Sequence, residues 1–191
     1  MTRGRMEAFS DGVIAIIITI MVLELKVPHG TDLEALRPLL PKIGSYVLSF
    51  IMLGIYWSNH HHLMHAVRHI DGRVLWANLH LLFWLSLYPV VMAWAGDSHF
   101  AAVPVAAWGL VQLMSGAAYF ILVRTLLAAH EKDSVLAAAI GRDFKGKASL
   151  VLYAAAVLLS FMNPTIAIAI YVLVMVMWLI PDPRIERRLE R

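Results

Sequence analysis

The chain has no cysteine and few charged residues. The absence of cysteine among its 191 residues excludes disulfide bonds, thiolate metal ligands and a cysteine nucleophile. Only 15% of the residues are Asp, Glu, Lys or Arg, which is well below the roughly 25% usual in soluble domains. Instead, 60% are hydrophobic and the mean hydropathy is +0.72. This composition predicts an integral membrane protein.

Sequence patterns of enzymes and nucleic-acid-binding proteins are also missing. The chain has no serine-nucleophile motif, no H-E-x-x-H and no glycine-rich phosphate loop. Although the net charge is +3, the basic residues lie between hydrophobic runs and do not form one stripe. We therefore expect no enzymatic activity, no cofactor and no nucleic-acid partner.

Four apolar runs reach about the 20 helical residues that span a bilayer, and two further runs, 148–161 and 165–180, are slightly short. They predict an all-α integral membrane protein with six transmembrane helices in a single domain, residues 1–191. The runs cover residues 9–27, 43–63, 74–95, 100–127, 148–161 and 165–180. The longest polar segment, 129–147, has room for a short interfacial helix.

The distribution of basic residues predicts the orientation of these helices. Lys and Arg that flank membrane spans stay on the cytoplasmic side. Of the 16 Lys and Arg residues, only Lys26, Arg37 and Lys42 fall on one side of the six predicted spans. Both termini are therefore expected in the cytoplasm.

Asp11 lies inside the first apolar run and needs a partner or solvent. An unpaired charge at the bilayer centre costs roughly 2.5–3.5 kcal/mol even on lenient insertion scales. One interpretation is a solvated carboxylate at the membrane interface. The other is a polar network in which Arg5, Ser10 and Asp11 tie the first helix to its neighbours.

Arg5, Phe9, Ser10 and Asp11 have the spacing R-x-x-x-F-S-D. This pattern resembles the signature of the transmembrane protein 175 family, whose members are cation channels. The resemblance implies a homotetramer with one six-helix unit per subunit and a central pore lined by the first helix. It also implies that a ring of bulky aliphatic side chains, Ile16 in this chain, narrows the pore.

The residue pattern of the first helix is compatible with that placement. Ile16, Thr19, Ile20 and Leu23 recur at i, i+3, i+4 and i+7 and so share one helical face. Ile16, Ile20 and Leu23 would form a hydrophobic constriction, and Thr19 would offer an oxygen to a partly dehydrated cation. An aliphatic stripe in a membrane helix is, however, more often lipid-facing or packed.

Glu24 follows this stripe and has two open interpretations. Four such carboxylates at the outer mouth of a pore would raise the local cation concentration. Alternatively, Glu24 pairs with Lys26 or Lys42.

A histidine-rich segment follows the second apolar run. His61, His65 and His69 share one face if the helix continues, and two histidines at i and i+4 can chelate zinc. A zinc site needs further ligands, and only Asp71 is near in sequence, so we predict no metal site. Polar bonding to the first helix is the favoured interpretation.

In the family, histidine and tryptophan from this region and the third helix bond the aspartate of the first helix. The resemblance therefore implies a structural polar network of Arg5, Phe9, Ser10 and Asp11 with side chains from these two segments. The candidates are His60, His61, His65, Trp76, Asn78 and His80.

Taken together, these patterns and the resemblance predict a potassium-permeable cation channel in a prokaryotic plasma membrane, with other monovalent cations and protons left open as permeant ions. The chain lacks the T-V-G-Y-G segment of ordinary potassium channels, so selectivity must have another origin. The alternative function is a proton-coupled or other secondary transporter that uses Asp11 and intramembrane histidines such as His80.

Overall fold

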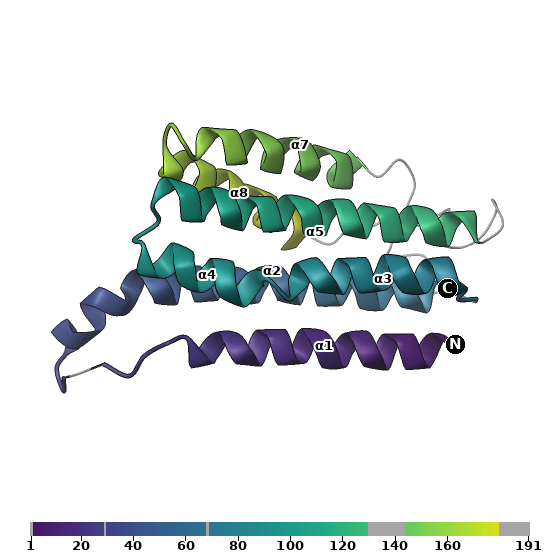
Figure 1. The fold of residues 1–191 in the computed structure, drawn as a ribbon, viewed down its shortest axis with the longest axis horizontal. Helices are drawn as coiled ribbons and strands as arrows, with labels where there is room; N and C mark the ends of the chain where they lie inside the picture. Colours follow the sequence, from purple (N-terminus) through teal and green to yellow (C-terminus); the bar gives the residue numbers. More distant parts are fainter. Residues whose placement is uncertain (1, 29, 68, 130–143, 180–191) are drawn as a thin grey trace.

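The computed structural model describes residues 2–28, 30–67, 69–129 and 144–179, and these residues form an antiparallel bundle of long helices (Figure 1). Within them there is no β-strand. In chain order the helices are α1 (Arg3–Leu23), the 3-10 helix η1 (Leu33–Leu39), α2 (Leu40–His65), α3 (Gly72–Leu85), α4 (Tyr88–Asp97), α5 (Ala102–Ala128), α7 (Phe144–Leu159) and α8 (Pro164–Leu179).

Several of these helices match the dimensions of a membrane. Four segments of the described chain are long and apolar enough to cross one: Arg3–Leu23, Leu33–His65, Gly72–Asp97 and Ala102–Ala128. The helix Pro164–Leu179 is apolar but shorter. The prediction of an all-α, multi-pass membrane protein is confirmed. The predicted interfacial helix falls largely on residues 130–143, outside the described residues.

The third predicted span, 74–95, is two helices in the structure. It breaks between α3 and α4, at Ser86 and Leu87, just before Pro89. Proline has no N–H to donate, and its ring collides with the carbonyl of the residue four positions earlier. The chain tightens there, and the amide of Leu87 donates to the carbonyl oxygen of Trp84 at 3.2 Å. The two helices still run in one direction (Figure 1).

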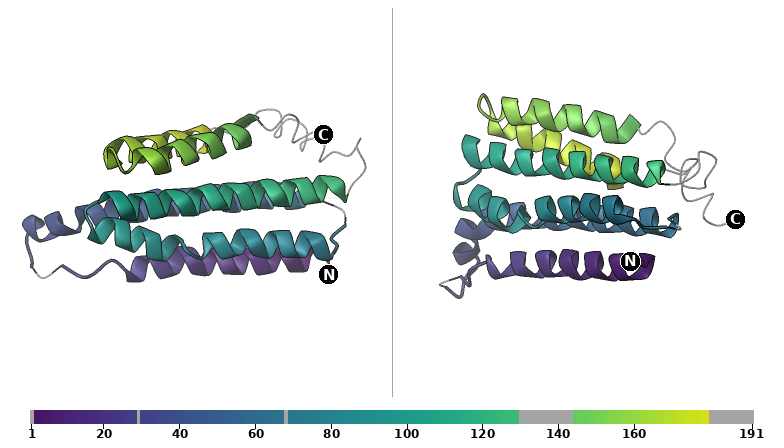
Figure 2. Two further views of the ribbon diagram at one scale, coloured as in Figure 1. Left: turned by 45° about the horizontal axis from the view of Figure 1, so that its top comes forward. Right: turned by 45° about the vertical axis from the view of Figure 1, so that its right-hand side comes forward.

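α1 lies along one edge of the bundle, and α7 lies along the opposite edge (Figures 1 and 2). α1 packs against α2, α3 and α4. The side chains that it buries recur at intervals of three and four residues, the spacing of one helical face. They are Met6, Ser10, Ile14, Ile17 and Met21. The opposite face of α1 is exposed and packs against no helix in the described part of the chain.

α5 occupies the middle of the bundle, in contact with α3, α4, α7 and α8. Its approach to α8 depends on Gly109. A Cβ atom at that position would collide with the hydroxyl oxygen of Tyr171, which donates to the carbonyl oxygen of Val105 at 3.2 Å. Glycine is therefore required where these two helices meet.

Candidate ion pathway and the polar contacts of α1

The predicted pore stripe occupies the uncovered face of α1. Ile16 is 58% exposed, Ile20 44% and Leu23 79%, whereas the opposite face is buried against α2, α3 and α4. Uncovered apolar side chains on a membrane helix face lipid, another subunit or a pore. Because no other described helix covers this face, it is free to line a pore.

Thr19 lies on the same uncovered face, and its hydroxyl hydrogen is already engaged. The Oγ1 atom donates to the carbonyl oxygens of Ala15 and Ile16, each at 3.0 Å. A hydroxyl has one hydrogen and two lone pairs. The lone pairs therefore stay available on the exposed side of the helix, where they can coordinate a cation.

On the buried face, three side chains form a hydrogen-bonded chain across α2, α3 and α1. His60 Nε2 lies 2.8 Å from Asn78 Oδ1, and Asn78 Nδ2 donates to Ser10 Oγ at 2.9 Å. Ser10 Oγ in turn donates to the carbonyl oxygen of Met6 at 2.8 Å. Because Asn78 Oδ1 can only accept, His60 must carry its hydrogen on Nε2. The hydrogen bonds are therefore donated in one direction, from His60 to Asn78, from Asn78 to Ser10 and from Ser10 to Met6. The side chains of His60, Asn78 and Ser10 are all buried.

Asp11 is bonded by a residue outside the predicted network. The indole N–H of Trp57, on α2, donates to Asp11 Oδ1 at 3.0 Å. Trp57 is not among the candidates that the sequence analysis named for this contact. The signal that could have found it is its spacing, since Trp57 precedes His61 by one helical turn and shares its face.

His61 and His65 contact Glu7, not Asp11. Glu7 Oε1 lies 3.1 Å from His61 Nδ1 and 3.9 Å from His65 Nε2, and Arg3 Nε lies 4.0 Å from Glu7 Oε2. α2 ends at His65, so His69 does not share this face. The sequence interpretation passed over Glu7 because it lies far from the histidines along the chain.

Asp71 caps α3. The backbone N–H of Val74 donates to Asp71 Oδ1 at 2.9 Å, and this bond holds the pKa of Asp71 below its ordinary value. An aspartate that accepts from the N-terminal amides stabilises the start of a helix. The carboxylate nearest to the histidines in sequence therefore has a structural task of its own.

The four other predicted network residues lie elsewhere. Arg5 and Phe9 are exposed on α1, and Trp76 is 76% exposed on α3. His80 Nε2 accepts the indole N–H of Trp84 at 2.9 Å. In the described part of the chain, Asp11 is bonded by Trp57 and His80 by Trp84, and no hydrogen bond joins His80 to Asp11.

At the far end of α1, Glu24 is exposed and forms the C-cap of the helix. The pairing of Glu24 with Lys42 that the sequence left open is not what the structure shows. Lys42 is buried, and its Nζ atom lies 2.6 Å from Asp97 Oδ1 at the end of α4. This ion pair joins α2 to α4 and leaves Glu24 at the end of the uncovered face.

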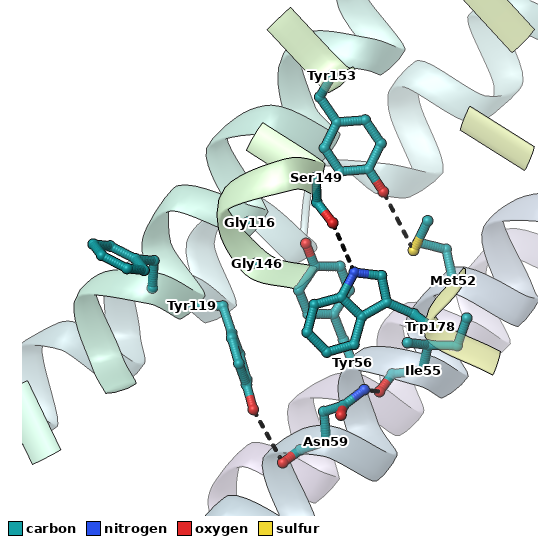
Figure 3. A pocket seen from close by; sticks show the side chains of 11 residues that line it. Met52, Ile55, Tyr56, Asn59, Gly116, Tyr119, Gly146, Ser149, Tyr153 and Trp178 are labelled. Carbon is teal, nitrogen blue, oxygen red and sulfur yellow. Dashed lines mark hydrogen bonds between the residues drawn. The ribbon is translucent and has the colours of Figure 1, made fainter. Parts of the chain in front are cut away.

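A separate pocket opens among α2, α5, α7 and α8 (Figure 3). Most of its polar side chains already have hydrogen-bond partners within the protein. Trp178 donates to Ser149 Oγ at 2.9 Å, and Tyr119 donates to the carbonyl oxygen of Asn59 at 3.2 Å (Figure 3). The remaining lining is mainly apolar, so the pocket offers little that would orient a polar ligand.

Comparison with known proteins identifies the family. Residues 5–89 match the family described as endosomal/lysosomal potassium channel TMEM175. A protein named as a potassium channel in a Chryseobacterium species, strain P1-3, is 53% identical over 190 residues, which cover 100% of this chain and 99% of that protein. The chain belongs to the TMEM175 family. The matched segment contains α1 from its third residue onward, all of α2 and α3, and with them the hydrogen-bonded residues Ser10, Asn78 and His60.

Two further TMEM175 proteins resemble this family member. A crystal structure titled as a lysosomal potassium-selective channel TMEM175 homolog from Chamaesiphon minutus superposes with a TM-score of 0.77 at 26% identity. The superposition covers 92% of this chain and 95% of that one. The human protein named endosomal/lysosomal proton channel TMEM175 is 35% identical over 80 residues, 36% of this chain and 16% of that protein.

Proposed function

We propose that this protein is a potassium-permeable cation channel that conducts passively, with both termini in the cytoplasm of a prokaryotic cell and the channel in its plasma membrane. Membership of the TMEM175 family and the name of the Chryseobacterium relative support the proposal. Other monovalent cations and protons remain candidate permeant ions, since the human relative carries the name of a proton channel.

The observation that carries this proposal is the uncovered face of α1. One subunit encloses no pore along this helix, because the face bearing Ile16, Ile20 and Leu23 is open. Four copies arranged around an axis beside α1 would bury that face and line a channel with it. We therefore propose a homotetramer in which α1 is the pore helix.

Within this pore, Ile16 would form the narrowest ring, followed by rings of Ile20 and Leu23. Rings of bulky aliphatic side chains obstruct ions by excluding water. Passage then requires either widening of the ring or a polar group that keeps water in place.

Thr19 and Glu24 would supply the polar atoms of the pathway. The lone pairs of Thr19 Oγ1 are free for a partly dehydrated cation, since its hydrogen is bound inside the helix. Glu24 lies beyond Leu23 on an exposed end, where four carboxylates would attract cations to the outer mouth.

The polar contacts between helices would hold the pore helix in position. The chain from His60 through Asn78 to Ser10, and the bond from Trp57 to Asp11, fix the rotation of α1 against α2 and α3. Interhelical hydrogen bonds in membranes contribute about 0.6 kcal/mol each on average. By fixing the rotation of α1, they would keep Ile16, Ile20 and Leu23 on the face that points away from the bundle.

Potassium flux from liposomes tests the function. Reconstituted protein should release potassium down its gradient without valinomycin, and Ile16→Asn should increase that flux because a polar ring keeps the constriction hydrated. Leu173→Asn is the matched control, because Leu173 on α8 is also 58% exposed and lies outside α1. Absence of flux, or equal flux from wild type and Ile16→Asn, would refute the proposal.

A further inference from the structure

Glu7, His61 and His65 gather at the end of the bundle where α1 begins and α2 ends. One carboxylate oxygen and two imidazole nitrogens from these residues all lie within 4.8 Å of one another. Glu7 and His61 are half-buried and His65 is exposed, so the group can be reached from solvent. These contacts take no part in the proposed pore.

We propose that these three residues form a binding site for a divalent transition metal of the zinc type. Zinc is commonly held by His and Glu or Asp ligands, and three protein ligands with a water complete a tetrahedral shell. Glu7 Oε1, His61 Nδ1 and His65 Nε2 are the ligand atoms, and the fourth position faces solvent.

The distances between the ligand atoms fit this assignment. At metal–ligand distances of about 2.0–2.2 Å, tetrahedral ligands lie roughly 3.3–3.6 Å apart. Glu7 Oε1 is 3.1 Å from His61 Nδ1 and 3.9 Å from His65 Nε2. Adjustments of well under 1 Å bring these two pairs to the required spacing, and the ligand nitrogens of His61 and His65 lie within 4.8 Å of each other.

The local structure favours the arrangement as well. His61 and His65 are one helical turn apart, and their ring centroids lie 4.4 Å apart in an edge-to-face arrangement. The neighbouring Trp57 ring stacks on His61 and limits its rotation. His60 is excluded as a ligand because it faces Asn78 inside the bundle.

Arg3 is the one cation that faces the carboxylate from α1. Its Nε atom lies 4.0 Å from Glu7 Oε2, the oxygen that the metal does not need, and its Nη1 atom donates to the carbonyl oxygen of His65 at 3.3 Å. Arg3 lowers the affinity for a cation but leaves Glu7 Oε1 accessible. Metal binding would join the first turns of α1 to the last turn of α2.

Zinc calorimetry on the purified full chain, without a polyhistidine tag, tests the site. Wild type should bind one zinc ion per subunit and melt at a higher temperature with zinc. Glu7→Gln, His61→Ala and His65→Ala should each weaken binding about tenfold or more and abolish the rise in melting temperature. His62→Ala, an exposed neighbour on the same helix, should behave as wild type.

Thermal melting without zinc shows whether each variant is folded. If an alanine variant does not fold, the glutamine variant at the same position, His61→Gln or His65→Gln, takes its place. Cobalt in place of zinc adds an absorption spectrum that reports tetrahedral coordination. The proposal is overturned if wild type binds no zinc, if His61→Ala and His65→Ala bind as tightly as wild type, or if His62→Ala loses as much. A protein that binds zinc but conducts no potassium would contradict the proposed channel function alone.

Discussion

Asn78 on α3 donates its amide N–H to the hydroxyl oxygen of Ser10 on α1, 68 residues earlier in the chain, across 2.9 Å. Both side chains are buried, and Asn78 also accepts from His60 on α2. A single amide therefore satisfies polar groups from two other helices. Asn78 therefore ties α1 and α2 to α3.

Asn78→Leu should destabilise the protein by about 1–3 kcal/mol, because it leaves the buried Nε2–H of His60 without an acceptor and removes the donor to Ser10 Oγ. Thermal unfolding in detergent would show the loss as a lower melting temperature. Trp76→Phe, on the same helix but exposed, should change stability by less than about 0.5 kcal/mol. Equal stability of Asn78→Leu and wild type would contradict the hydrogen-bonded chain.

Trp57 and Asp11 should be energetically coupled. Trp57→Phe removes the indole N–H and keeps an aromatic ring, while Asp11→Ala removes the acceptor. A double-mutant cycle on the unfolding free energy should give a coupling of about 0.5–1.5 kcal/mol. The control cycle combines Asp11→Ala with Trp94→Phe on α4, a tryptophan of similar exposure, and should be additive. If both cycles are additive, the bond between Trp57 and Asp11 does not help to hold α1 in position.

The ion pair of buried Lys42 with exposed Asp97 should respond differently to loss of either partner. Asp97→Asn leaves the ammonium of Lys42 buried without its counter-charge, whereas Lys42→Met removes that charge and leaves Asp97 exposed. Losing the partner of a buried ion is the more costly change. Asp97→Asn should therefore lower the melting temperature more than Lys42→Met does, and the reverse order would show that Lys42 reaches solvent.

Gly109→Ala should destabilise the contact between α5 and α8 by about 1–3 kcal/mol, because its methyl group meets the hydroxyl of Tyr171. Gly54→Ala is the control, since a Cβ there meets nothing within 4 Å. Adding Tyr171→Phe to Gly109→Ala should restore part of the loss by removing the colliding oxygen. Thermal unfolding of the three variants measures both effects, and a neutral Gly109→Ala would contradict the close approach.

The sequence predicted the membrane fold because hydrophobicity is a local property. The apolar runs and their polar boundaries are visible without knowing what packs against what. The break between α3 and α4 has a local signal as well, since Pro89 lies inside the predicted span 74–95, but hydropathy does not register the missing N–H of a proline. Composition alone does not distinguish one broken helix from one straight helix.

The partners of α1 could not be predicted in the same way. Neighbouring histidines on α2 point to different helices, because successive residues are turned by about 100° around a helix. His60 therefore faces Asn78 inside the bundle, while His61 faces Glu7 at its surface. Glu7 and Trp57 became candidates only when the rotation of α1 against α2 was known.

The proposed position of Ile16 in the pore can be tested directly because the chain contains no cysteine. Ile16→Cys places one thiol per subunit in an otherwise cysteine-free chain. A charged, water-soluble thiol reagent should block potassium flux through Ile16→Cys liposomes and leave Leu173→Cys liposomes unaffected. Full flux through Ile16→Cys channels after labelling has been verified by mass spectrometry would contradict the account.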